Sequence, residues 1–439
     1  MANVPAIEQI NTGVVMLWFD RAVFICLCAL VFVLPVSTAG VEFFGYLAIF
    51  IFLVNRGIAA RRQKMGVLIP QALSPGIILP LVCFLGICGL SILWSVNPRL
   101  SIRAFAGKSV GAALLFLTAA GTFTSRERIV RFAWVLLVSA FLVSIDGMWQ
   151  LWQGHDLFKG ELLSAGRVRA AMRHPNGLGA YLIFALLPAL ALTCWSWTRD
   201  ARGIFSSFLG RACMVVLTVS LLAVLGLTFS RGAWIGFMVG VSVLGMLRPR
   251  YLLSLVLSAG VFLIIFTPMI LTSRHVTLLS DSPVLKEFFD VSAIQGSGRL
   301  GFWKDALRVI ADHPAGTGLN TYTVVIRQYP VRWQAYPHNS YLQMAAEIGV
   351  LGLGIFLWFI SRVARRTACG VRAASHDVGG VFIVGLFAGW AGIMVQSALD
   401  TTFYSVQLSR LLWLAMGLLL AAVFMVEKRS REQGLSREI

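Results

Sequence analysis

Residues 337–352 read PHNSYLQMAAEIGVLG, and they join a polar segment to an apolar one. His338 and Asn339 stand at the end of the polar segment, and the apolar run 341–361 follows directly. About 20 apolar residues in a helix cross the ~30 Å hydrocarbon core of a bilayer. The stretch therefore predicts an imidazole and an amide at a membrane surface, at the start of a membrane helix.

The composition extends this prediction to the whole chain. Of the 439 residues, 58% are hydrophobic and 13% are charged, whereas about a quarter of the residues of a soluble protein are charged. A net charge of +18 would suit nucleic-acid binding, but most Lys and Arg lie in short runs between apolar segments. The seven cysteines show neither metal-ligand spacing nor a disulfide framework. We therefore expect contact with membrane lipids and none with nucleic acid.

Twelve apolar runs are long enough to be membrane spans, so we predict an all-α polytopic membrane protein of about twelve transmembrane helices. The second and eighth runs are the shortest. The first is expected to remain as a helix because no signal-peptide cleavage pattern accompanies it. In chain order the runs are, approximately, 22–38, 41–55, 76–95, 104–122, 130–151, 177–197, 211–229, 232–247, 251–272, 341–361, 378–398 and 405–426.

Basic residues follow every even-numbered run and so predict the orientation. Examples are Arg126 and Arg128 after the fourth run, and Arg365 and Arg366 after the tenth. Because cytoplasmic loops carry an excess of Lys and Arg, we expect these loops and both termini to be cytoplasmic. The odd-numbered exits, and His338 with them, then face the outer side.

Two of the outward connections are long, at about 152–176 and 273–340. The second far exceeds the ~15 residues of an ordinary loop, which favours a functional loop or cap. Within it, RLGFWKDALRVIADH (299–313) has an apolar residue at each helical turn, which predicts an amphipathic helix across the mouth of the bundle. Those apolar residues are Leu300, Trp303, Leu307 and Ile310. The predicted division is 1–272 for spans one to nine, 273–340 for a partly helical periplasmic loop, and 341–439 for spans ten to twelve with a cytoplasmic tail.

Arginines on outward segments are exceptions to the topology rule and need another explanation. A guanidinium presents a planar fork that matches phosphate oxygens, so such a cluster beside a membrane predicts a lipid-linked phosphate or diphosphate. The stronger candidates are Arg231, in a tight turn between two spans, and Arg167, Arg169 and Arg173 of the first long connection. Arg99, Arg103 and Lys108, about one helical turn apart, are weaker candidates.

Two cations fall inside the outer ends of their spans, where a charge is costly. These are Lys108 and Arg410. Each can extend its charged group to the interface, and Arg410 could instead pair with Asp400.

Several stretches of the chain resemble the bacterial O-antigen ligases of the Wzy_C-type superfamily. That family has a motif of His, then Asn, Ser or Gln, nine residues, Gly, two residues, and Gly, Thr or Tyr. His338, Asn339, Gly349 and Gly352 match this motif position for position. Small residues at the spacing of the two glycines let another helix approach closely. Three further stretches are similar to the family: LSILWSVNPRLSIRAF (90–105), RHPNGLGAYL (173–182) and TFSRGAWIG (228–236).

The resemblance implies a GT-C-like fold in the bacterial inner membrane and transfer of a glycan from undecaprenyl diphosphate to a sugar hydroxyl of the lipid A-core. The transfer would occur on the periplasmic face with inversion, without metal, ATP or cofactor. A sugar hydroxyl is a weak nucleophile, and a neutral imidazole is a suitable base, so His338 is the expected general base. Diphosphate needs charge stabilisation instead, which the arginines can supply. Asn339 is expected to orient the histidine or bind a sugar hydroxyl, and Glu347 is either catalytic or a buried structural carboxylate.

Three other functions stay open at this point. An O-antigen polymerase would use an undecaprenyl-linked glycan as acceptor too, and a protein O-oligosaccharyltransferase would use a protein. A transporter of lipid-linked oligosaccharides would also have about twelve spans, but repeated halves and a midplane site are typical of transporters. The identity of the glycan and the oligomeric state do not follow from the sequence.

Overall fold

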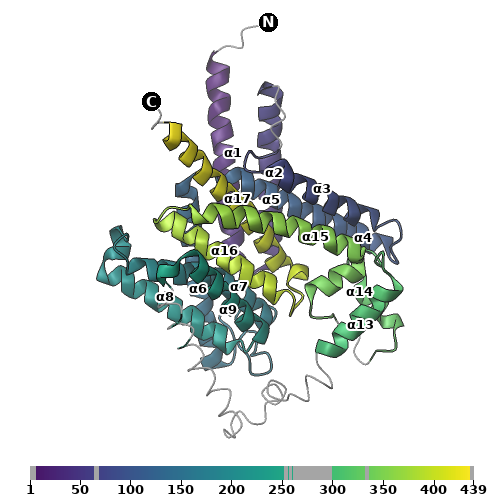
Figure 1. The fold of residues 1–439 in the computed structure, drawn as a ribbon. Coiled ribbons are helices and arrows are strands. Elements are labelled where there is room, and N and C mark those ends of the chain that lie inside the picture. Colours follow the sequence, from purple (N-terminus) through teal and green to yellow (C-terminus); the bar gives the residue numbers. More distant parts are fainter. Residues whose placement is uncertain are drawn as a thin grey trace.

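The computed structural model describes residues 6–63, 69–251, 256, 260, 299–331 and 336–435, and every regular element in these ranges is helical (Figure 1). The helices are α1 (Ala6–Val33), α2 (Thr38–Gln63), α3 (Pro75–Leu90), α4 (Pro98–Ala104), α5 (Gly111–Thr122), α6 (Arg126–Gln153), α7 (Pro175–Ser196), α8 (Phe208–Leu227), α9 (Arg231–Leu247), α13 (Arg299–Asp312), α14 (Tyr322–Val325), α15 (Ser340–Arg372), α16 (Val378–Gln396) and α17 (Val406–Leu435). A π-helical turn, η1 (Phe105–Val110), joins α4 to α5, and a 3-10 turn, η5 (Thr402–Tyr404), precedes α17.

The predicted class of fold is confirmed. In the described ranges, nine helical spans are long and apolar enough to cross a membrane, and two shorter apolar helices, α3 and α9, accompany them. The predicted ninth span, 251–272, lies outside the described residues except at 251, 256 and 260. The count of twelve and the three-part division of the chain therefore stay predictions.

Glycines bring α7, α9 and α16 into close contact at the centre of the bundle. A Cβ added at Gly392 of α16 would lie 2.4 Å from the carbonyl oxygen of Gly236 on α9, and one at Gly389 would lie 3.2 Å from the Cα of Phe184 on α7. Such close backbone approach is typical of helix pairs in membranes. The packing brings together the end of α16 and the starts of α7 and α9, where the candidate site lies.

The two ends of the bundle differ. In Figure 1 both termini lie at the upper end, and α13 and α14 lie toward the opposite end. That both termini share one side of the membrane, and which side it is, stay predictions.

The amphipathic helix predicted within 299–313 is confirmed as α13. Its buried face matches the predicted one only in part, since Ile310 packs against the buried cluster. Ala306 and Val309 are fully buried in a small cluster with residues of α14 and α15, whereas Leu300 and Leu307 are 44% and 53% exposed. Because α13 packs closely on its neighbours, a small side chain such as Ala306 suits the contact face. The larger leucines point away from it.

The helix α15 breaks at Gly349, which has φ 78° and ψ 166°. The segment before α14 docks into the break: the Val350 N–H donates to the Pro314 carbonyl at 3.3 Å, and the Gly318 N–H donates to the Glu347 carbonyl at 2.8 Å. A Cβ at Gly349 would lie 2.8 Å from the Pro314 oxygen. Gly349 of the motif therefore allows the backbone of a loop to approach closely. Its spacing in the sequence had suggested that another helix would do so.

Candidate active site

His338 and Asp400 form a side-chain pair at the end of the bundle opposite the termini. The Nδ1 atom of His338 lies 3.3 Å from Oδ1 of Asp400, which stands in the loop after α16. Ser340 fixes this geometry, because its Oγ donates to the Asp400 carbonyl at 2.8 Å and its N–H donates to the Ser397 carbonyl at 2.8 Å. His338 itself has φ 47°, a strained value for a non-glycine residue that is typical of functional positions.

The pair is open on the histidine side. The His338 side chain is 40% exposed and that of Asp400 is 17% exposed. Burial raises the pKa of Asp400, but the hydrogen bond and charge of His338 and the nearby charge of Arg299 outweigh it and hold this pKa below its usual value. Asp400 is therefore an anion at neutral pH.

The cap helix α13 contributes to the same place. The ring of Phe302 lies 5.7 Å from the His338 ring, measured between centroids. Burial lowers the pKa of the Arg299 guanidinium, and the charge of Asp400 opposes this change, which indicates that the two side chains share one local field. The first turn of α13 thus brings an aromatic face and a cation to the pair.

Asn339 begins α15 as its N-cap. Its Oδ1 accepts hydrogen bonds from the N–H groups of Tyr341 at 3.0 Å and Leu342 at 3.1 Å. Such capping stabilises a helix start. The oxygen of Asn339 therefore holds the start of the helix next to His338.

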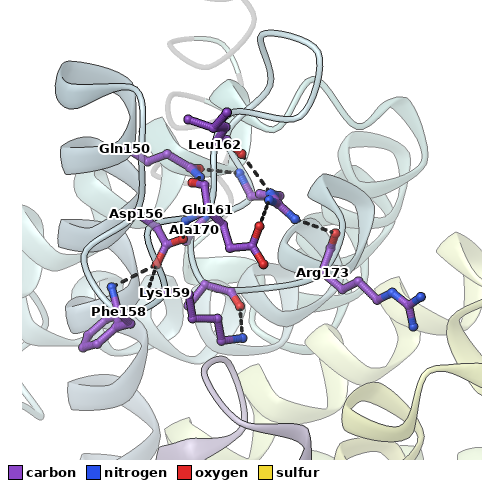
Figure 2. A network of polar contacts seen from close by, with 10 residues as sticks. Gln150, Asp156, Phe158, Lys159, Glu161, Leu162, Ala170 and Arg173 are labelled. Carbon is purple, nitrogen blue, oxygen red and sulfur yellow. Dashed lines mark hydrogen bonds and ion pairs between the residues drawn. The ribbon is translucent and has the colours of Figure 1, made fainter.

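The connection that carries three of the predicted arginines is held by acceptors from α6 and from the connection itself (Figure 2). Oε1 of Gln150 accepts from the N–H groups of Arg169 and Ala170, each at 2.9 Å. Asp156 accepts from three successive parts of the same loop, the N–H groups of Phe158, Lys159 and Glu161. The loop is thus a fixed platform.

Arg169 and Arg173 differ in what their guanidinium groups do. That of Arg169 donates to Glu161 at 2.6 Å, to the Leu162 carbonyl at 3.0 Å and to the Arg173 carbonyl at 3.3 Å. Figure 2 shows the Arg173 side chain extending away from this network. Arg169 therefore clamps the platform, and Arg173 is its outward cation.

Arg167 and Arg231 lie beside the loop that carries Asp400. Arg167 donates to the Thr228 carbonyl at 2.8 Å and to Oδ1 of Asn176 at 2.7 Å, and the Asn176 carbonyl accepts from the last residue of α16 at 3.0 Å. Arg231 is the first residue of α9, and a Cβ on the next residue would lie 3.1 Å from Cβ of Leu399. The predicted cations Arg167 and Arg231 thus belong to segments that pack beside the end of α16 and the loop that leads to Asp400.

The pKa of His174, which precedes α7, depends on charges both in the platform and in the His338–Asp400 pair. Burial lowers its pKa, as do the positive charges of Arg173 and Arg169, while the charge of Asp400 raises it. The end of the platform and the His338–Asp400 pair therefore share one electrostatic environment.

Lys108 belongs to a second polar cluster nearby. Its Nζ donates to Oδ1 of Asn320 at 2.6 Å and lies 5.4 Å from the ring centroid of Tyr404. Glu347, which is 1% exposed, accepts from the Asn320 N–H at 2.7 Å and from the Tyr404 hydroxyl at 3.1 Å. Behind this cluster is a narrow, mostly apolar cavity of about 70 Å³. The contacts favour the structural interpretation of Glu347.

The remaining predicted cations lie apart from the pair. Arg99 and Arg103 are exposed on α4. Arg410 is buried and donates to Glu42 at 3.2 Å and to the Gly107 carbonyl at 3.1 Å. The suggested pairing of Arg410 with Asp400 is wrong, because Arg410 lies a turn inside α17 and there meets α2 and η1.

Asp400, Arg299 and Phe302 are site residues that the sequence analysis did not select. Asp400 directly follows the predicted span 378–398, and the other two begin the predicted amphipathic helix. An acidic residue at the outer end of a span was thus the available signal. Its pairing with a histidine 62 residues earlier was not readable from the sequence.

The fold and the site together define a multi-pass membrane protein with a His–Asp pair and several arginines at one end of the bundle. Residues 214–357 match the family model described as O-Antigen ligase, which supports membership of an O-antigen ligase-like family. This match agrees with the resemblance seen in the sequence, and it indicates an activity of O-antigen ligase or polymerase type on a lipid-linked glycan.

Four chains of solved structures match this chain. One of them belongs to a peptidoglycan synthase complex that coordinates polymerization and crosslinking. The similarity covers 81% of this chain and 98% of that one, with 19% sequence identity and a TM-score of 0.44. No curated protein matches the chain.

Proposed function

We propose that the protein is an O-antigen ligase that transfers a glycan from undecaprenyl diphosphate to a sugar hydroxyl of the lipid A-core. The observation that carries the proposal is the His338–Asp400 pair at 3.3 Å, open on the histidine side. The reaction would take place at the periplasmic face of the inner membrane. It needs no nucleotide, metal or other cofactor, because the donor is already activated.

In the proposed step, the Nδ1–H of His338 donates to Asp400, and Nε2 accepts the proton of the acceptor hydroxyl. The hydroxyl oxygen then forms a bond to the anomeric carbon, and the bond from that carbon to the diphosphate oxygen breaks. Undecaprenyl diphosphate leaves with the electron pair. A single displacement of this kind inverts the anomeric carbon. Asp400 stabilises the imidazolium that forms.

Cations and helix starts would hold the diphosphate. Arg167 and Arg231 belong to segments beside the Asp400 loop, and Arg173 directly precedes His174, which feels the charges of both Arg173 and Asp400. Arg169 supports the platform that carries Arg167 and Arg173. The first residues of α7, α9 and α15 also meet this loop, through Asn176, Gly232 and Ser340. The starts of helices carry partial positive charge and favour anions. Arg99, Arg103 and Lys108 are proposed as outer contacts for the same substrate.

The acceptor decides between this function and the runner-up, an O-antigen polymerase. A purified-protein assay would supply undecaprenyl diphosphate-linked glycan and lipid A-core, with EDTA and without nucleotide. We expect a glycan-bearing lipid A-core product from the wild-type protein and none from His338→Ala. Full activity of the alanine variant would refute the base assignment.

The products of the same assay separate the competing functions. Lengthened undecaprenyl-linked glycan as the sole product would establish a polymerase. With a protein acceptor supplied, a glycosylated protein as the sole product would favour a protein O-oligosaccharyltransferase. Movement of the intact donor across a vesicle membrane, with no transfer product, would favour a transporter.

A further inference from the structure

A polar pocket lies at the end of the bundle where α17 ends, away from His338. Its volume is about 620 Å³, and it is formed where α7 and α15 end, where α6 and α16 begin, and beside the last part of α17. Its charged lining residues are Arg126, Asp200, Arg202, Asp377 and Arg429. This pocket has no part in the proposed transfer.

Hydrogen bonds fix one wall of the pocket. The indole N–H of Trp195 donates to the His376 carbonyl at 2.8 Å, and the buried Arg248 donates to the Ala374 carbonyl at 3.1 Å. Asp377 caps α16 by accepting from the Gly380 N–H at 3.0 Å. Because these contacts hold the segment before α16 in place, the pocket exists before any ligand enters.

The two carboxylates of the pocket already have cationic partners. Arg126 Nε lies 3.1 Å from Oδ2 of Asp377. Arg250, next to the lining, lies 3.1 Å from Oδ2 of Asp200. Burial and the charges of Arg250 and Arg248 lower the pKa of His376, so this histidine is neutral at neutral pH and offsets no charge.

Two lining arginines are left over. Arg202 and Arg429 are exposed, and within the described part of the chain the side chain of neither makes an ion pair or hydrogen bond. They come from different segments, the loop after α7 and the end of α17. The pocket therefore carries about two uncompensated positive charges on a fixed frame.

We propose that this pocket binds a phosphate-bearing anion between Arg202 and Arg429. Guanidinium groups bind phosphate oxygens in a forked geometry, and basic pockets between membrane helices bind phosphorylated lipid headgroups. Apolar residues complete the lining, among them Trp195, Val378 and Val426. The phosphate can belong to an anionic lipid or to a soluble compound, because the guanidinium groups would bind the phosphate oxygens of either in the same way.

The test compares two double variants with equal loss of charge. Arg202→Gln with Arg429→Gln removes the lining pair, and Arg199→Gln with Arg431→Gln removes two exposed arginines nearby that do not line the pocket. One arm titrates inorganic pyrophosphate into detergent-solubilised protein by calorimetry. The other measures phosphatidylglycerol retained from mixed phosphatidylglycerol–phosphatidylcholine nanodiscs by native mass spectrometry. About 0.15 M salt limits long-range effects, since the screening length is then about 8 Å.

We expect the lining variant to weaken binding about tenfold or more, and the matched control to stay within about twofold. Loss confined to the pyrophosphate arm identifies a soluble phosphate compound, and loss confined to the lipid arm identifies a headgroup. No binding by the wild-type protein in either arm, or equal loss in both double variants, would overturn the proposal. Equal melting temperatures of the three proteins exclude unfolding as the cause.

Discussion

Asp400 and Glu347 are two carboxylates at the same end of the bundle, and their surroundings differ in kind. Asp400 is 17% exposed and shares its partner His338 with solvent. Glu347 is 1% exposed and is surrounded by donors. Those donors are the N–H groups of Asn320 and Tyr322, the Gln343 amide and the Tyr404 hydroxyl.

The hydrogen-bond donors around each carboxylate indicate a structural role for Glu347 and a role in the reaction for Asp400. The donors of Glu347 come from the cap, from α15 and from η5, so this carboxylate joins three parts of the fold. Asp400 touches an imidazole that still has an open side, so its charge can act on a proton that moves. We therefore expect loss of Asp400 to affect turnover and loss of Glu347 to affect stability.

The largest expected effect is that of Asp400→Asn on turnover. The amide keeps the shape but not the charge that stabilises the imidazolium of His338, so kcat should fall on the order of 100-fold or more. Asp305→Asn, on the cap helix, is the matched control, because its carboxylate pairs with the neighbouring Arg308. If both variants kept wild-type kcat, Asp400 would have no role in the reaction.

Gly349→Ala tests the docking on which the Glu347 cluster depends. A methyl group at φ 78° would be strained and would lie 2.8 Å from the Pro314 oxygen. Strain of this kind and loss of the docking hydrogen bonds should cost about 3 kcal/mol of unfolding free energy. Gly354→Ala lies on the same helix with nothing within 4 Å of its added Cβ, so it should be neutral or slightly stabilising. Melting in detergent measures both, and equal shifts would contradict the docking interpretation.

Glu347→Gln should destabilise the protein with little loss of turnover in the molecules that remain folded. The new amide NH2 would face donors that now meet a carboxylate oxygen, and an unsatisfied buried donor costs about 2 kcal/mol. The measurements are the melting temperature and the kcat per folded molecule. A fall in kcat as large as that of Asp400→Asn, without a change in stability, would give Glu347 a chemical role.

The sequence was enough to predict the helices and to select His338, but not to predict which side chains pair with one another. The membrane helices and α13 followed from apolar runs and helical spacing, and His338 was selected from its place before an apolar run and from the family motif. The His338–Asp400 pair did not follow, because it joins residues far apart in the chain, on two loops held by Ser340. Nor did the different uses of Arg169 and Arg173, since two arginines four residues apart look alike until the loop that holds them is folded.

Arg169 and Arg173 of the platform differ in the same way as Glu347 and Asp400, and we expect smaller effects from replacing them. Arg173→Gln should raise KM for the donor about tenfold, in line with loss of one charge-assisted hydrogen bond, and leave the melting temperature unchanged. Arg169→Gln should lower the melting temperature as well, because it removes the contact with Glu161 at 2.6 Å. Donor titrations and melting curves separate the two, and the reverse pattern would exchange their roles.

The smallest expected effect is on stability in acid. Because the pKa of Asp400 is held below its usual value, its contribution is complete above about pH 4 and is lost as the pH falls through the lowered pKa. Wild type should therefore exceed Asp400→Asn in unfolding free energy at pH 6, by about 1 kcal/mol or less for one partly exposed pair. The difference should shrink toward zero at pH 3. If the difference in unfolding free energy did not change with pH, the asparagine would disturb packing and the charge of Asp400 would not contribute to stability. Disturbed packing would then also explain the loss of turnover in this variant.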